Sequence, residues 1–193
     1  MGGAPGTGSD ADAQAATNRY VALLRGVNVG GRSVPMGELR ELFRGLGHID
    51  VTTYIQSGNV LFATPRDDAA GLADELRGAI AAELGHHVTV ILRTPSDLER
   101  VLAHNPYAAR GEPNRLYVTF LDGAPDPALV AGLDAAAGGA DQFSIRRHEV
   151  YVWCPTGYGR TVLSNEFFER RLKLAATTRN WRTVSRLATL AGG

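Results

Sequence analysis

The stretch that decides the fold is Val51-Thr-Thr-Tyr-Ile-Gln-Ser-Gly-Asn-Val-Leu-Phe-Ala63. Its two ends, 51–55 and 59–63, are rich in β-branched and aromatic residues, which favour strands. Gln56-Ser57-Gly58 joins them and is short enough for a hairpin, with a glycine available for a positive φ. We therefore predict two antiparallel strands connected by this turn.

Helices and two more strands flank the hairpin. Leucines and Phe43 recur at helical spacing over 39–46, and apolar residues do so again over 72–84, each followed by a glycine that can end a helix. Tyr20-Val-Ala-Leu-Leu-Arg25 is a short, almost entirely apolar run, typical of a strand buried on both faces, and 88–92 returns to strand character. The predicted order is β-α-β-β-α-β.

The same order of elements returns in the second half. We predict a strand over 116–121, a helix beginning at Pro127, and a strand pair over 142–145 and 150–154. Ser164 and Thr178 are each expected to cap a helix, which makes the second half β-α-β-β-α-α. The fold class is therefore α+β: two ferredoxin-like βαββα units from an internal duplication, with mostly antiparallel sheets and helices packed on them.

The domain boundaries follow from these elements. Residues 1–18 show no apolar periodicity and are predicted to be a disordered tail. The first unit is expected over 19–93, a linking helix and loop over 94–114, and the second unit with an extra C-terminal helix over 115–193.

Composition bounds the function classes. The 193 residues are 44% hydrophobic, and 20 basic residues balance 20 acidic ones, so no overall positive field recruits nucleic acid or an anionic membrane. The single Cys154 cannot form an internal disulfide, and no long apolar run or signal segment opens the chain, so we predict a cytoplasmic protein. The five histidines have no metal-ligand spacing, so no metal or cofactor is predicted. No catalytic nucleophile can be named, and whether the protein is an enzyme stays open.

Topology gathers polar groups at one edge of the first sheet. A right-handed β-α-β crossover makes the first two strands parallel, with the third between them running the opposite way. The end of the first strand and the hairpin turn then emerge together, and they carry Arg25, Gly26, Asn28, Gly30, Gly31, Gln56, Ser57, Gly58 and Asn59. A guanidinium, carboxamides and open backbone N–H groups can bind an anionic or carbonyl-bearing ligand, including a nucleotide or phosphorylated metabolite.

Two stretches of the second unit are candidates for the same site. They supply Gly157, Tyr158, Gly159, Arg160, Arg179 and Asn180. The alternative interpretation is structural: Gly and Asn make turns, and Arg25 can simply pair with a carboxylate. The docking of the two units decides between the interpretations.

Four motifs together resemble one family. They are Arg25-Gly-Val-Asn-Val-Gly-Gly31 with Val34-Pro-Met36, Tyr54-Ile-Gln-Ser-Gly-Asn-Val60, Gly157-Tyr-Gly-Arg160 and Thr178-Arg-Asn-Trp181. The chain resembles the bacterial family of domain of unknown function 1697 over 20–190. The resemblance implies two α+β subdomains of ferredoxin-like type and brings no established activity. Arg32-Ser33 and Arg182 depart from the family's usual residues.

Two other functions stay open beside ligand binding. One is a protein-interaction or assembly module, because ferredoxin-like sheets can expose edges and the second sheet carries aromatic residues. The other is RNA binding through a C-terminal group of arginines, namely Arg160, Arg170, Arg171, Arg179, Arg182 and Arg186. The oligomeric state is not predicted.

Overall fold

The computed structural model describes residues 17–27, 34–56, 58–133 and 139–192. Its first half is a four-stranded sheet with the order β2-β3-β1-β4, in which every neighbouring pair is antiparallel. The elements are β1 (Asn18–Leu24), α1 (Met36–Gly45), β2 (Ile49–Thr53), β3 (Asn59–Thr64), α2 (Ala69–Leu84) and β4 (Val90–Arg93). This is the ferredoxin-like arrangement, with β3 between the parallel strands β1 and β2 as predicted.

The second half repeats the arrangement with the sheet order β6-β7-β5-β8. Helix α3 (Pro95–Ala103) leads into it. The elements are β5 (Leu116–Leu121), α4 (Pro127–Ala131), β6 (Gln142–Arg146), β7 (Glu149–Trp153), α5 (Asn165–Leu172), β8 (Ala176–Asn180) and α6 (Trp181–Gly192). The predicted fold class, two ferredoxin-like α+β units, is thereby confirmed.

Side chains at the helix starts satisfy backbone N–H groups that have no partner within the helix. Thr94 and Asp97 form a capping box at α3, and the hydroxyl of Ser164 accepts from the N–H of Phe167 at α5. Asp68 caps α2 through the N–H of Gly71. These polar residues fix where α2, α3 and α5 begin.

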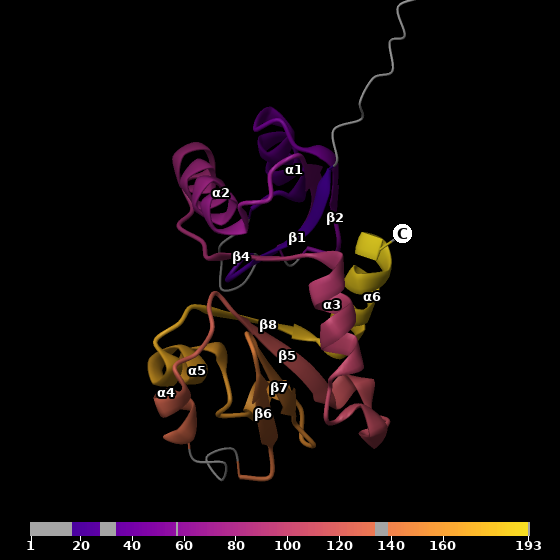
Figure 1. The fold of residues 1–193 in the computed structure, drawn as a ribbon, viewed down its shortest axis with the longest axis vertical. Helices are drawn as coiled ribbons and strands as arrows, with labels where there is room; N and C mark the ends of the chain where they lie inside the picture. Colours follow the sequence, from indigo (N-terminus) through magenta and orange to yellow (C-terminus); the bar gives the residue numbers. More distant parts are fainter. Residues whose placement is uncertain (1–16, 28–33, 57, 134–138, 193) are drawn as a thin grey trace, which may run out of the picture.

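The molecule is layered, with α3 and α6 between the two sheets (Figure 1). Helices α1 and α2 cover the outer face of the first sheet, and α4 and α5 cover that of the second. The inner faces of both sheets share one apolar cluster with α3 and α6, which includes Leu23, Leu98, Phe120 and Leu187. Strand β1 is therefore buried on both sides, as its apolar run predicted.

The sequence interpretation needs correction in two places. Thr178 does not cap a helix, because it lies in β8 opposite Thr119 of β5; Asn180 accepts the N–H of Thr183 and caps α6 instead. The second unit therefore has a fourth strand and closes as the first does. Ile55 is not in a strand but in the following turn, with φ of +50°. The predicted tail lies outside the described residues up to residue 16, and β1 begins at Asn18.

Candidate functional site

Each sheet sends one arginine from its last strand into the other unit. Arg93 of β4 lies opposite Val21 of β1, and Arg179 of β8 lies opposite Val118 of β5. The last residues of β1 and β5 also correspond, since Leu24 faces Val90 and Leu121 faces Ala176. Arg93 and Arg179 are thus equivalent positions of the duplicated unit, and we call their interactions the Arg93 contact and the Arg179 contact.

The Arg179 contact joins the second unit to the end of β1. Its Nε donates to Asn59 Oδ1 at 2.6 Å, and Nη2 donates to the carbonyls of Leu24 at 2.8 Å and Gly58 at 3.2 Å. Nη1 donates to Thr177 Oγ1 and to the carbonyl of Thr178. Burial lowers the pKa of this guanidinium to about 10.

The Arg93 contact repeats this geometry in the opposite direction. Its Nε donates to Glu149 Oε1 at 2.9 Å, and Nη2 donates to the carbonyls of Leu121 at 2.7 Å and His148 at 3.2 Å. Glu149 is the first residue of β7, as Asn59 is the first residue of β3. The two contacts differ in chemistry, because a carboxylate receives Arg93 and a carboxamide receives Arg179.

The end of β1 and the hairpin turn meet as predicted, and they lie at the interface between the units. The N–H of Leu24 donates to the carbonyl of Gly58 at 2.8 Å, which confirms that strand end and hairpin turn meet. Arg25 Nη2 lies 2.8 Å from Glu169 Oε2 and 3.7 Å from Glu166 Oε1, both on α5. Arg25 therefore pairs with carboxylates, the structural alternative noted for it.

Other predicted site residues fall in different surroundings. Asn59 is fully buried and its amide also donates to the carbonyl of Tyr54, whereas Gln56 is exposed. Gly26 lines a cavity of about 200 Å³ together with Val27 and residues 85–88. The predictions for Asn28, Gly30, Gly31 and Ser57 lie outside the described residues. Ligand binding by this cluster stays a prediction.

The glycine-rich stretch of the second unit is tied down by Tyr158. Its hydroxyl donates to Thr178 Oγ1 at 3.0 Å, and Thr178 in turn donates to Asn165 Oδ1 at 2.6 Å. Burial raises the pKa of Tyr158 above its ordinary value. Gly159 and Arg160 are exposed, and Gly157 has φ of +96°. Tyr158 thus reaches β8 next to Arg179, while Arg160 faces solvent.

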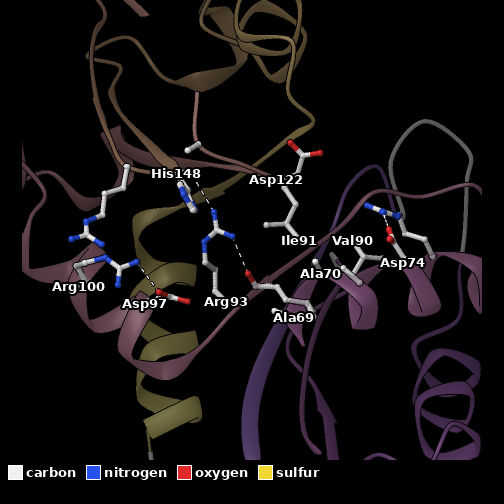
Figure 2. Close-up of a pocket in the computed structure, with 15 residues that line it drawn as sticks. Ala69, Ala70, Asp74, Val90, Ile91, Arg93, Asp97, Arg100, Asp122 and His148 are labelled. Carbon is white, nitrogen blue, oxygen red and sulfur yellow. Dashed lines mark hydrogen bonds and ion pairs between the residues drawn. The ribbon is translucent and has the colours of Figure 1, made fainter. Parts of the chain in front are cut away.

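A larger cleft, of about 750 Å³, lies at the Arg93 contact, and Figure 2 shows its walls coming from both units. The first unit contributes residues of α2 and β4, the linking helix α3 contributes Asp97 and Arg100, and the second unit contributes the segments after β5 and between β6 and β7. We call it the Arg93 cleft, lined by Ala69, Ala70, Ala73, Asp74, Arg77, Val90, Ile91, Leu92, Arg93, Asp97, Arg100, Asp122, Ala124, Arg147 and His148.

Comparison of the two duplicated units explains why a cleft is left at the Arg93 contact. Counted from the N-caps Asp68 and Ser164, Ala70 and Ala73 of α2 occupy the places of Glu166 and Glu169 of α5. Asp122, which follows Leu121, occupies the place of Arg25, which follows Leu24. Short alanines replace the glutamates that reach across the other interface, and the space they leave is part of the cleft.

Most charged groups of the Arg93 cleft have protein partners. Arg100 Nη2 lies 2.7 Å from Asp97 Oδ1, and Arg77 pairs with Asp74. Burial alone would raise the pKa of Asp97, but hydrogen bonds from Thr94 and Arg100 hold it below its ordinary value. Among the described residues, none pairs with the side chain of Arg147 or Asp122, both of which are exposed.

The sequence reasoning missed the Arg93 cleft entirely. Its charged residues are dispersed over α2, α3 and two turns, so no local motif indicates them. One signal was present: Arg93 ends a strand at the position equivalent to Arg179, but this equivalence is visible only once β8 is recognised as a strand.

The structure also bears on the alternative functions. Arg179 is buried, so it cannot belong to an RNA-binding surface, whereas Arg160, Arg170, Arg171, Arg182 and Arg186 are exposed. Tyr151 of the second sheet is buried between the sheets, and Trp153 is half-buried beneath Arg110, whose guanidinium carbon lies 4.0 Å from its ring centroid. Tyr151 and Trp153 therefore pack against other parts of the protein.

In the part of the chain that the structure describes, no three His, Cys, Asp or Glu side chains are placed to hold a metal ion. Among the same residues, no helix has the length and apolar character needed to cross a bilayer.

Comparisons with known proteins support the fold and identify the family of this chain. It is similar in structure to the conserved bacterial protein SP0830 from Streptococcus pneumoniae, with a TM-score of 0.68 and 24% identity over 91% of this chain and 99% of that one. This likeness supports the fold. No curated protein matches the chain significantly. The sequence model of the family described as "Protein of unknown function (DUF1697)" matches residues 17–151, and the chain belongs to this family.

Proposed function

We propose that this protein binds a small anionic metabolite in the Arg93 cleft. The observation that carries the proposal is a cleft of about 750 Å³ between the two units, in which four arginines face three aspartates and Arg147 has no partner among the described residues. Ligand sites commonly lie at such junctions and are largely pre-formed. The ligand class is the one that the sequence predicted, but the location is the equivalent interface on the other side of the molecule.

Arg147 is the residue best placed to receive the anion. Its side chain is exposed at the cleft and no described residue pairs with it. It sits in the turn between β6 and β7 with φ of +54°, a conformation that costs a residue with a Cβ about 1–2 kcal/mol. The turn therefore holds an arginine where glycine or asparagine would be less strained.

Arg100 extends the positive wall, and His148 lies beside it. Arg100 is held by Asp97, which fixes its guanidinium and leaves its other N–H groups to face a ligand. The carbonyl of His148 accepts from Arg93, so the backbone beside the cleft is anchored to the Arg93 contact. A phosphate or carboxylate entering here would find the guanidinium of Arg100, held by Asp97, and that of Arg147.

The test compares adjacent arginines. Thermal unfolding is measured with and without pyrophosphate in wild type, Arg147→Gln and Arg146→Gln; Arg146 is also exposed but does not line the cleft. Saturation at a hundred times Kd stabilises by about 2.7 kcal/mol, which for a chain of this size is a rise of about 5–10 °C in Tm. We expect the rise in wild type and Arg146→Gln and its loss in Arg147→Gln. General anion effects would persist in both variants. An equal rise in all three proteins, or no rise in wild type, would refute the proposal.

A further inference from the structure

The two interfaces of the duplicated units carry opposite charge arrangements. At the Arg179 contact, the strand end supplies a cation, Arg25, and the facing helix supplies the carboxylate of Glu169. At the Arg93 contact, the strand end supplies a carboxylate, Asp122, and the equivalent helix position is Ala73. One ion pair of the duplicated unit is therefore formed, whereas at the other interface the described residues supply only its acidic member, Asp122.

The Arg93 cleft is also polarised along its length. Figure 2 shows Arg100 and Asp97 on one side of Arg93, and Asp122 and Asp74 on the other. The second side holds two carboxylates against the single cation of Arg77. The first side holds Arg100 against Asp97. His148 is preceded in the chain by Arg147, which has no ion-pair partner among the described residues. A ligand that spans the cleft meets surplus positive charge at one end and surplus negative charge at the other.

We propose that the ligand of the Arg93 cleft is zwitterionic, with its anionic group at Arg100 and Arg147 and a primary ammonium group at Asp122. This rests on the proposed function and specifies it. With Asp122, the ammonium group forms an ion pair equivalent to the one between Arg25 and Glu169 at the other interface. A compact cation with three donors fits beside Ala70 and Ala73, where no side chain of the helix fills the space.

The experiment uses paired probes that differ by one ammonium group. Alkyl phosphates and ω-aminoalkyl phosphates of two to six carbons are titrated calorimetrically into wild type, Asp122→Asn and Asp126→Asn. Asp126 caps α4, a role that asparagine fills equally well, and it lies outside the cleft lining, so it is the matched control.

We expect one chain length at which the amino compound binds wild type and Asp126→Asn about fivefold more tightly than its alkyl partner. Asp122→Asn should lose this preference while keeping its affinity for the alkyl phosphate. Equal affinities within every pair in wild type, or a preference that survives Asp122→Asn, would overturn the zwitterionic ligand alone. If neither series binds wild type, or if Arg147→Gln binds both series as wild type does, the proposed function itself fails.

Discussion

Removing Arg93 should cost more stability than removing its equivalent, Arg179. The side chains of Arg93 and Glu149 are 8% and 2% exposed, so Arg93→Met leaves a carboxylate buried without its counter-ion. Such a change costs about 3–5 kcal/mol, a large part of the 5–15 kcal/mol by which a typical protein is stable. Arg179→Met leaves neutral acceptors, three of them in the other unit. At about 1 kcal/mol for each, we expect a loss near 3 kcal/mol.

A double-mutant cycle isolates the charge. Glu149→Met in the Arg93→Met background removes the stranded carboxylate, so the double variant should be more stable than the sum of single effects implies by at least about 2 kcal/mol. Glu149→Gln alone gives Arg93 the kind of partner that Arg179 has in Asn59, and should cost only about 1–2 kcal/mol.

The assay is guanidinium chloride unfolding followed by the fluorescence of the two tryptophans, Trp153 and Trp181. Trp181 packs in the cluster shared by both units, so it reports on their separation. Losses for Arg93→Met and Glu149→Met that add within about 0.5 kcal/mol would refute the reasoning, because independent sites add and a buried pair does not.

Three further perturbations test separate features of the fold. His48 is buried against Phe43 and Phe62, its ring nitrogens have no hydrogen-bond partner among the described residues, and burial lowers its pKa from 6.5. The unfolded chain then binds more protons, so stability should fall as pH drops through 6.5, and His48→Leu should flatten that slope in urea titrations at several pH values. Gly58 has φ of +69°, and a Cβ added there would lie 2.9 Å from that of Leu24, so Gly58→Ala should lower the free energy of unfolding by about 2–4 kcal/mol. Gly47 also has a positive φ but has open space around it, so Gly47→Ala should lower it by only about 1–2 kcal/mol. Equal losses in chemical unfolding would contradict this comparison. Cys154 is fully buried and burial raises its pKa to about 11, so 5,5′-dithiobis(2-nitrobenzoate) should label it only after denaturant is added, and rapid labelling of the native protein would show the thiol to be accessible.

Most of the fold could be predicted because most elements carry their own local signals. The buried run of β1, the turn at Gly58 and the cap at Ser164 each act over a few residues, and each was identified correctly. Strand β8 was missed because Thr178, Arg179 and Asn180 are polar and lack the alternation of a half-buried strand. What holds them in a strand is tertiary: pairing with β5 and insertion of Arg179 into the other unit.

The candidate site was predictable only in part, for a related reason. The expected strand order alone predicted that Arg25 lies beside the hairpin turn, and this prediction is correct. It could not show that Glu169 of the second unit reaches Arg25, because docking depends on contacts between residues far apart in the chain. The Arg93 cleft depends on docking altogether, since Arg100, Asp122 and Arg147 meet only when the units pack.

The reciprocal arginines restrict how the two halves can move. A rocking motion that widens the cleft around Arg93 must drag its guanidinium away from Leu121 and Glu149, and the opposite motion must do the same to Arg179 at Leu24 and Asn59. Because one of the two contacts breaks in each direction, rotation of the units either way costs free energy. We therefore expect the proposed ligand to enter the Arg93 cleft without prior opening of the two units, so that its association rate depends on solvent viscosity only through diffusion.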